Sequence, residues 1–478
     1  FAFDLNSRFS NNLSNQLLVT FSKLDDVRGS SSDKFPFIDI LHAGDYAAGK
    51  IMPYISAGYE LFTWNNGVHN NVLNIKDDIT YFTGNHKITA GLTYEYQMAD
   101  NAYMRNGTGY YRYASLEDFL NQAAPETVCL TYGYMKDGKF EENPAARVRY
   151  HQIGAYAQDE WTPVENFKLT YGLRLDALAF DNQDLMTNNA ILAVDYNGKN
   201  IDTGKWPTTK LRVAPRVGFT WDVLGDKSLK VRGGTGVFSG RLPLVFFTNM
   251  PTNSGMVQYQ AKLGETQTII PGYTGAYIEK KEGDKVKQYY DMSEFAGGLL
   301  KREELLAKLT SLGFPNTISP EDGTAPSEIS AVDPKFKMPQ VWKTSLAIDY
   351  NFPTSFPFSI SAEGIFNKTI NGVIIRDWSV NPVDGFARFN GVDNRPIFQN
   401  YKQTYEKDGK VSNLPNAYVL ENTNKGYGYS GTFTMNMRPI EGLSLMAAYT
   451  HTASKELTGM PGSNASSVLN YMGTIYGP

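Results

Sequence analysis

The segment between residues 103 and 113 carries the clearest ligand-binding chemistry in this sequence. Its letters, YMRNGTGYYRY, place Tyr110, Tyr111 and Tyr113 beside Arg105 and Arg112. Such rings stack on sugars, and guanidinium groups bind over aromatic faces, so the set suits a sugar ring or a clamped peptide. The same residues also suit a loop that simply packs on its neighbours. We therefore predict either ligand binding or loop packing at these five positions.

Catalytic groups form no recognisable arrangement. The five histidines lie far apart in the sequence, without the His-x-x-x-His spacing of a metal site: His42, His69, His86, His151 and His451. The glycine run at 233, 234, 236 and 240 lacks the Gly-x-Gly-x-x-Gly spacing of a nucleotide-binding loop, because Ser239 occupies the third position. We therefore predict that the protein is not an enzyme and needs no cofactor.

Metal binding has one weak candidate. Asp181, Asp184 and Asp195 offer the oxygen ligands that Ca²⁺ takes, but solvated loop charge explains them better. Cys129 stands alone, which excludes an internal disulfide and a cysteine-held zinc or iron–sulfur site. The sequence therefore predicts no metal site.

Composition narrows the fold class. The 478 residues are 13% aromatic and 20% charged, with a net charge of −4. This charge is too balanced for a dedicated nucleic-acid binder, and the aromatic content is too high for a disordered chain. The longest apolar stretches are a few residues, against the roughly 20 that a membrane-spanning helix needs. An aromatic-rich β protein remains, and transmembrane barrels share its modest hydropathy because half of each strand faces a polar lumen.

Alternation of apolar and polar residues is the dominant pattern. Leu169, Tyr171 and Leu173, for example, alternate with Thr170 and Gly172. Membrane strands need about 9 to 11 residues, and alternating segments near this length recur along the chain. We predict twelve strands, at 1–9, 16–24, 70–82, 88–98, 150–161, 167–178, 211–223, 228–240, 342–352, 358–366, 427–437 and 443–449.

Short and long connections alternate between these strands. The short ones are rich in turn-forming residues and lie at 10–15, 83–86, 162–166, 224–227, 352–356 and 439–442. The long ones run about 25–69, 99–149, 179–209, 241–339 and 368–424. Short periplasmic turns and long extracellular loops are typical of barrels in the bacterial outer membrane. The predicted fold is therefore all-β, a transmembrane antiparallel β-barrel.

The alternation of short and long connections also decides where an ambiguous segment belongs. A strand at residues 54–64 would put the turn at 83–86 on the long-loop side, so we assign residues 54–64 to the first loop. Two helices are expected inside the loops. Ser115 opens one that ends before Pro125, and a second is expected where Phe295, Leu299, Leu306 and Leu309 share a helical face.

Aromatic residues mark the two expected membrane interfaces. Trp161 and Trp221 precede short turns, whereas Tyr96, Trp342 and Tyr427 lie next to long loops. Ordinary core aromatics of a β-sandwich are the alternative.

Two residues conflict with an ideal strand. Asp159 shares the face of Trp161 and must lie near the interface, where a charge costs little. Pro215 costs a ladder hydrogen bond and predicts a bulge or a local break.

Several segments resemble one known family. The stretches GAYAQDEWTPVENFKLTYGLRLDAL (154–178) and APRVGFTWDVLGDKSLKVRGGTGVFSGRLP (214–243) are similar to the barrel of TonB-dependent outer-membrane receptors. The hairpin 80–96 and the segment 28–40 look like the same family, and the closest likeness is to the Oar-type receptors of Bacteroidetes and myxobacteria. The pattern covers most of residues 1–455.

The resemblance implies a 22-strand barrel, an N-terminal plug and a TonB box pulled by an inner-membrane complex. This sequence departs from that pattern, because we find no plug and no TonB box, and about twelve strands cannot close such a barrel. We therefore expect residues 1–478 to be an internal, partial barrel domain, with the last residues, TIYGP, starting another external loop.

The polar face of three successive strands, 167–178, 211–223 and 228–240, also gains an expected role from the resemblance. Its charged residues would pair with the plug or be wetted by channel water, and plug contact is favoured: Arg174, Asp176, Arg212, Arg216, Lys230 and Arg232.

The leading functional hypothesis is TonB-driven uptake of a ligand captured by the loops. The ligand would be a peptide, a glycan or another nutrient, and the expected partners are membrane lipid, the plug, the TonB complex and a surface lipoprotein, but no nucleic acid. The alternatives are a passive porin, a surface adhesin, or export of a protein cargo.

Overall fold

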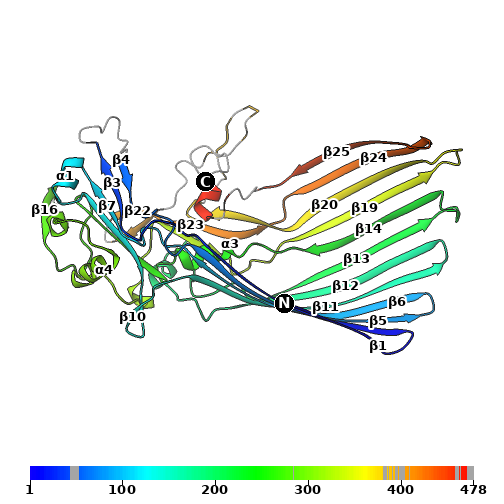
Figure 1. Cartoon of the computed structure of the whole chain (residues 1–478), viewed down its shortest axis with the longest axis horizontal. Helices are drawn as coiled ribbons and strands as arrows, with labels where there is room; N and C mark the ends of the chain where they lie inside the picture. Colours follow the sequence, from blue (N-terminus) through cyan, green and yellow to red (C-terminus); the bar gives the residue numbers. More distant parts are fainter. Residues whose placement is uncertain are drawn as a thin grey trace.

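The computed structural model is a curved antiparallel sheet with folded loops gathered at one end (Figure 1). It describes residues 1–42, 53–283, 285–380, 410–457 and 464–470, together with 385, 387–389, 391–392, 394, 397, 404–407 and 462. Among these residues, no helix combines the length and the apolar character needed to span a membrane. The last five residues, expected to start a loop, lie outside the described residues, as do parts of the first and fifth loops.

Twelve strands form the wall of the sheet, and they are the twelve that the alternation predicts. They are β1 (Ala2–Arg8), β2 (Leu13–Val27), β5 (Gly67–Thr83), β6 (His86–Ala102), β11 (Ala146–Val164), β12 (Phe167–Asp181), β13 (Lys210–Asp222), β14 (Leu229–Ser239), β19 (Gln340–Asn351), β20 (Phe358–Asp377), β24 (Tyr427–Ile440) and β25 (Leu443–Lys455). Each pairs with its sequence neighbours in antiparallel register, from β1 at one edge to β25 at the other.

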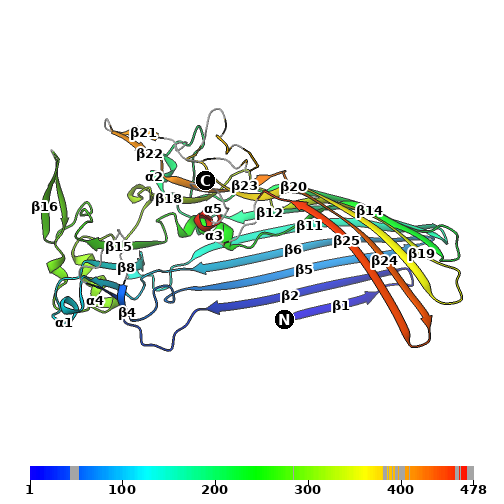
Figure 2. The same cartoon turned by 90° about the horizontal axis from the view of Figure 1, so that it is seen from above.

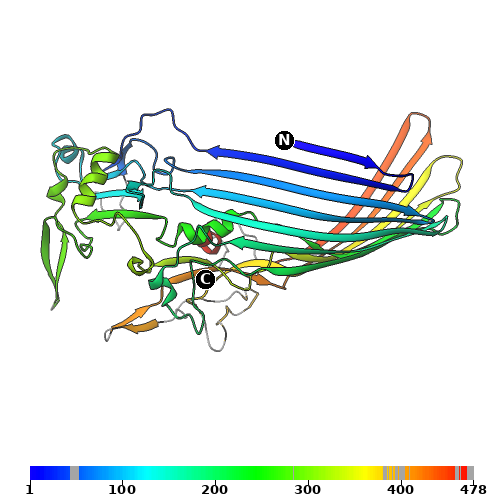
Figure 3. The same cartoon turned by 90° about the horizontal axis from the view of Figure 1, so that it is seen from below.

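All the short connections lie at one end of the wall and all the long ones at the other (Figures 2 and 3). The short ones are residues 9–12, 84–85, 165–166, 223–228, 352–357 and 441–442. The long ones are 28–66, 103–145, 182–209, 240–339 and 378–426. Gly84 has a φ of 54°, a left-handed conformation that favours glycine in so tight a turn. The predicted alternation of short and long connections is confirmed.

The segment 54–64 lies outside the wall, as the alternation of connections requires. Its strand β4 (Pro53–Ala57) pairs with β3 (Phe37–Leu41) in a separate sheet built by the loops. Two further strands extend the wall at its loop end. The strand β23 (Asn416–Thr423) pairs in antiparallel register with the last residues of β20, and β18 (Glu328–Val332) pairs in parallel with β23. Six other strands form two-stranded hairpins in the loops: β9 (Met135–Lys136) with β10 (Lys139–Phe140), β16 (Tyr277–Glu282) with β17 (Lys285–Tyr290), and β21 (Thr404–Lys407) with β22 (Lys410–Asn413).

The two faces of the wall differ in polarity. Leu92, Ile153 and Leu346 lie on one face and are 63%, 60% and 51% exposed. The strand register places all five predicted interfacial aromatics on this same face. They are Tyr96, Trp161, Trp221, Trp342 and Tyr427. An exposed apolar face with aromatic residues toward its ends is what contact with lipid requires.

Asp159 lies on the apolar face but close to the short-turn end. Its Oδ2 accepts a hydrogen bond from the Tyr171 hydroxyl (2.9 Å) and lies 2.7 Å from Nδ1 of His86, the first residue after the turn 84–85. The His86 ring stacks on Trp161 with 5.7 Å between the ring centroids. Asp159 thus lies near one end of the wall and has polar partners there, and its position at the membrane interface stays a prediction.

Pro215 produces a break rather than a bulge. The β13 ladder with β14 ends at Arg216 opposite Gly236, although β14 continues to Ser239. Pairing with β12 on the other side continues through Pro215 without a shift. The missing N–H therefore ends pairing on one side only.

Candidate functional site

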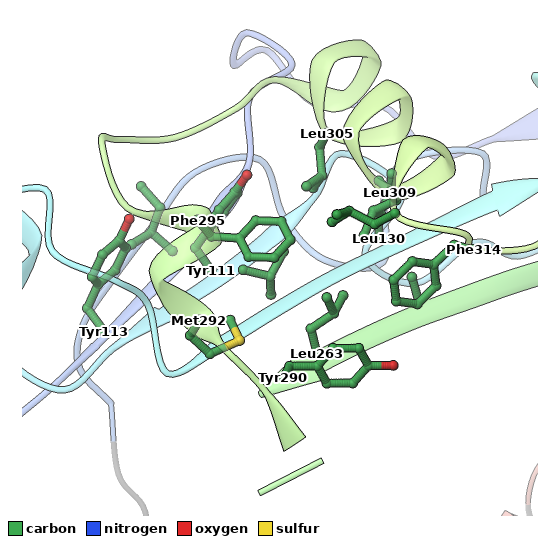
Figure 4. Packing of buried hydrophobic residues seen from close by; sticks show 14 of the residues in the cluster. Tyr111, Tyr113, Leu130, Leu263, Tyr290, Met292, Phe295, Leu305, Leu309 and Phe314 are labelled. Carbon is green, nitrogen blue, oxygen red and sulfur yellow. The ribbon is translucent and has the colours of Figure 1, made fainter. Parts of the chain in front are cut away.

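A five-stranded sheet in the loops supports the candidate site. Its order is β15 (Gln258–Gly264), β8 (Thr127–Gly133), β7 (Tyr110–Tyr113), β3 and β4. Alternate residues of these strands point to one face and are almost fully buried (Figure 4). That face includes Ile38, Ile40, Tyr111, Tyr113, Val128, Leu130, Tyr132, Ala261 and Leu263. The loops thus have a hydrophobic core of their own.

Helices cover the apolar face of this sheet. The helix α4 (Arg302–Ser311) buries Leu305 and Leu309, and the 3₁₀ helix η2 (Met292–Phe295) buries its two end residues. The prediction of one helical face through Phe295, Leu299, Leu306 and Leu309 is therefore wrong. Gly297 and Gly298 have φ values of 96° and 109°, which separate η2 from α4.

The other loop helix was predicted correctly. The helix α1 (Leu116–Leu120) begins after Ser115, whose hydroxyl accepts a hydrogen bond from the backbone N–H of Asp118 at 3.1 Å. Short helices also occur elsewhere in the loops. They are α2 (Asn189–Leu192), α3 (Val245–Thr252), η3 (Pro320–Asp322) and α5 (Ala465–Asn470).

The opposite, polar face of the loop sheet borders a cavity of about 560 Å³. Tyr110, Cys129 and Lys262 lie directly opposite one another on three adjacent strands of this face. Arg105 and Arg112 also line the cavity. Its volume falls in the range of small-molecule sites, which is about 300–1,000 Å³. We refer to it as the loop cavity.

One wall of the loop cavity is fixed by a hydrogen-bonded network. The Tyr110 hydroxyl donates to Asp39 Oδ2 (2.8 Å) and accepts from Arg112 Nε (2.9 Å). Ser56 donates to the other carboxylate oxygen of Asp39 at 2.5 Å. Burial, and then the hydrogen bond to Asp39, raises the pKa of Tyr110 well above its usual value, so the phenol stays neutral.

The loop cavity is lined by the three cations Arg105, Arg112 and Lys262 and by the three carboxylates Asp39, Glu126 and Glu265. Arg105 lies over the Phe62 ring, 5.3 Å from its centroid, and has no ion pair among the described residues. Lys262 is exposed and likewise forms no ion pair in the described part of the chain. The positive charges of Arg105, Lys262 and Arg112 each favour the ionised form of the nearby Cys129 thiol. These groups can bind the negatively charged or hydroxyl-rich part of a ligand.

Cys129 should react slowly while the loops are folded. Its side chain is 5% exposed, and burial raises the pKa of the thiol to about 11, against the opposing effect of the nearby cations. Compared with the usual value of 9.0, this lowers the thiolate fraction at pH 8 by about 100-fold. We expect iodoacetamide labelling, followed by mass spectrometry, to be slower by at least that factor than in urea. Equal rates would contradict the structure, and Cys129→Ser is the blank because the chain has no other cysteine.

A second, larger cavity of about 1170 Å³ adjoins the loop cavity and shares Arg105 and Gln260 with it. Its lining is mainly aromatic and neutral polar, with Tyr103, Tyr134 and Tyr259 among its residues. Tyr134 is held in place because its hydroxyl donates to the Gly255 carbonyl at 3.0 Å. Aromatic and neutral hydrogen-bonding groups suit the uncharged part of a ligand.

The structure separates the five residues predicted for ligand binding. Arg105, Tyr110 and Arg112 line the loop cavity, whereas Tyr111 and Tyr113 are 0% and 1% exposed in the core. The packing alternative therefore describes Tyr111 and Tyr113, and ligand contact stays a prediction for the other three. Sequence reasoning missed Asp39 and Lys262, although the alternation in 258–264 is a signal that could have placed Lys262 on a polar strand face.

The residues predicted to face the lumen lie on the polar face of the wall, opposite the lipid-facing side. Arg174 binds Asp176, with 2.7 Å between Nη2 and Oδ1. Arg232 pairs with Asp349 (3.1 Å) and Glu363 (3.3 Å) on the next strands. The others in this set are Arg212, Arg216 and Lys230, and contact with a plug stays a prediction for all of them.

The three aspartates considered for Ca²⁺ have separate partners. Asp184 pairs with Arg149 at 3.2 Å, Asp181 accepts from the Gln183 backbone N–H, and Asp195 accepts from that of Gly198. Within the described ranges, no three His, Cys, Asp or Glu side chains form a group that could hold a metal.

A lipid-facing antiparallel wall with short turns at one end and folded loops at the other defines a transmembrane β-barrel of the bacterial outer membrane. Residues 1–476 match the family described as "Outer membrane beta barrel domain", and the chain belongs to that family. A search of curated proteins gives no match.

Similar solved structures include two transporters and one receptor. The outer membrane transporter YddB from Escherichia coli has 10% sequence identity and a TM-score of 0.49, and the match covers 95% of this chain and 41% of that chain. The FrpB iron transporter from Neisseria meningitidis has 12% identity and a TM-score of 0.42, with 95% of this chain and 44% of that chain covered. The siderophore receptor PirA from Acinetobacter baumannii has 11% identity and a TM-score of 0.41, with 96% of this chain and 45% of that chain covered. The chain thus spans less than half the length of each of these proteins.

Proposed function

We propose that this protein is a TonB-dependent outer-membrane receptor that captures an external ligand with its loops and imports it with energy transmitted by TonB. The observation that carries the proposal is the loop cavity on a loop sheet with its own hydrophobic core. A cavity on a rigid support suits capture of a specific ligand, for which a passive pore has no need.

We also propose that the wall is part of a larger barrel of the Oar-like, 22-strand type, with a plug and a TonB box elsewhere in the protein. Among the described residues, β1 pairs only with β2, and β25 only with β24. Lipid cannot satisfy the backbone groups of an open strand edge, so further strands must cover both edges. Residues 1–478 would then be one part of the barrel domain.

The ligand class follows from the two adjoining cavities. Arg105, Arg112 and Lys262 would hold an acidic or hydroxyl-rich group, and the larger cavity would hold an uncharged part. A peptide or a glycan combines both features. A surface lipoprotein is the proposed partner in capture.

Uptake is tested by comparing the culture medium of cells that make the full-length protein with that of deletion cells, using untargeted mass spectrometry. We expect at least one solute to be depleted only by producing cells, and a protonophore to stop the depletion. The double variant Arg105→Ala with Lys262→Ala should slow depletion at least tenfold, because the loss of even one charge-assisted bond costs roughly 1.5–3 kcal/mol in favourable cases, and about 1.4 kcal/mol corresponds to a factor of ten. Lys281→Ala, on the exposed hairpin strand β16, is the matched control.

The outcome also separates the alternatives. Depletion that continues in the presence of the protonophore would indicate a passive porin. Unchanged medium together with reduced cell attachment in the deletion strain would indicate an adhesin. A protein lost from the medium of the deletion strain would indicate export.

A further inference from the structure

A separate cavity of about 320 Å³ lies against the lumen face of the wall, and arginines dominate its lining. Four of them border it, namely Arg174, Arg212, Arg216 and Arg241, whereas Asp176 is the one carboxylate in the lining. We refer to it as the arginine cavity. It shares no lining residue with the loop cavity.

The arginine cavity lies where β13 and β14 separate. Pairing of these strands ends at Arg216 opposite Gly236, because Pro215 has no N–H to donate. Beyond that point the lining comes from both strands, with Ala214 on one side and Phe238 and Ser239 on the other. The break in the ladder thus leaves room that a continuous sheet would fill.

Two of the arginines are neutralised within the protein. Arg174 donates from Nε and Nη2 to Asp176, which uses both carboxylate oxygens. Arg241 pairs with Glu95. Arg212 lies directly opposite Asp176 on the paired strand and has to share this carboxylate with Arg174. Four arginines against the two carboxylates Asp176 and Glu95 leave a net charge of +2 around the cavity.

Arg212 carries one of the unbalanced charges, and it is only 4% exposed. Its Nη2 donates to Gln152 Oε1 at 3.1 Å, but its buried Nε has no hydrogen-bond partner in the described structure. A buried charge that is only partly compensated costs free energy, so a buried guanidinium group normally has a carboxylate of its own and a hydrogen-bond partner for each nitrogen. An acceptor from outside the described residues would complete the site.

Arg216 carries the other unbalanced charge. Its guanidinium carbon lies 5.5 Å from the centroid of the Phe238 ring, and no carboxylate of the described residues lies within ion-pair distance. Arg212 and Arg216 occupy the same face of β13. Together they can present several N–H donors to a single anion, and guanidinium groups match carboxylates in geometry as well as charge.

We propose that the arginine cavity binds a carboxylate, either on an anionic solute that enters from the loops or on an acidic side chain of another segment of the same protein. In the first case the site would be a second binding point inside the barrel. This case rests on the proposed uptake function, whereas the second does not. Both place the oxygen atoms against Arg212 Nε and the Arg216 guanidinium.

Succinate is a suitable probe, with the neutral succinamide as its matched control. Binding to the purified full-length protein is measured by calorimetry, and thermal unfolding is followed in parallel. If the carboxylate comes from a solute, we expect succinate but not succinamide to bind, and Arg216→Gln and Arg212→Gln to weaken binding at least tenfold. Lys343→Gln removes a charge from the same lumen face but outside the cavity and should change binding less than twofold.

If the carboxylate belongs to the protein, succinate should not bind, and Arg216→Gln should lower the melting temperature while Lys343→Gln does not. Arg216 has only a ring contact within the described residues, so a fall in melting temperature reports the loss of an additional partner. The proposal is overturned if succinate binds equally to all variants, or if it does not bind and Arg216→Gln melts like the wild type. Neither readout depends on uptake, so failure of the uptake experiment leaves this result interpretable.

Discussion

Leu130→Ala should unfold the loop sheet without disturbing the wall. Leu130 is 0% exposed at the centre of the loop core, between the sheet and α4. Truncating a buried leucine to alanine costs about 2–5 kcal/mol, because the lost contacts leave a cavity. Limited trypsin digestion of outer membranes in increasing urea should therefore show cleavage of the loops at a clearly lower urea concentration.

A matched control comes from the same loop region. Leu120 is 69% exposed on α1, so Leu120→Ala should leave the digestion midpoint unchanged. The wall is followed separately by the mobility of unheated protein in SDS gels, where folded barrels migrate differently. An unchanged digestion midpoint in Leu130→Ala, or loss of the folded wall band, would show that loops and wall do not unfold as separate units.

The wall could be predicted from the sequence because each of its signals is local. Alternation identifies a strand from about ten neighbouring residues, and turn residues identify the hairpins. Wall strands pair with their neighbours along the chain, so the register of β11 and β12 follows from the turn between them. Only the strand lengths differ, since β5 and β6 continue past the expected ends to Gly67 and Ala102.

The loop cavity could not be predicted because its walls come from distant segments. Strand β3 pairs in parallel with β7, and β15 joins β8 across more than a hundred residues of sequence. No local pattern places Lys262 beside Cys129. Nevertheless, the YYRY segment alternates, and treating it as a strand would have placed Tyr111 and Tyr113 on one face and Tyr110 and Arg112 on the other.

The second expected loop helix is present as α4, but its extent and its buried face were predicted wrongly, for a different reason. Spacing alone put Phe295 and Leu309 on one helical face, but it ignored the glycine pair at 297–298, which takes up positive φ and ends the first helical turn. Burial then follows Leu305 and Leu309, four residues apart in α4, whose side chains meet the sheet. A pair of glycines that breaks the helix therefore outweighs a helical spacing of apolar residues.

Leu346→Arg should destabilise the wall far more than the same substitution at the adjacent Ser345. Leu346 is 51% exposed near the middle of β19, on the face that contacts lipid. An arginine on the lipid face at the bilayer midplane of a barrel costs about 2–4 kcal/mol, whereas a residue on the lumen face remains in contact with water. We expect Leu346→Arg to lower the free energy of unfolding by about that amount, and Ser345→Arg to lower it much less, in urea unfolding of the protein in phospholipid vesicles.

The neighbours of the two residues explain why this pair is a stringent test. Leu346 lies opposite Gly233 and Gly364, so no bulky side chain shields an arginine there from lipid. Ser345 faces the lumen, where Glu363 on the next strand and water are available to a cation. Equal destabilisation by the two arginines would mean that the faces are not divided between lipid and lumen. Because each wall strand pairs with its neighbour in a fixed register, that result would reassign the face of every residue in the wall, including the arginine cavity.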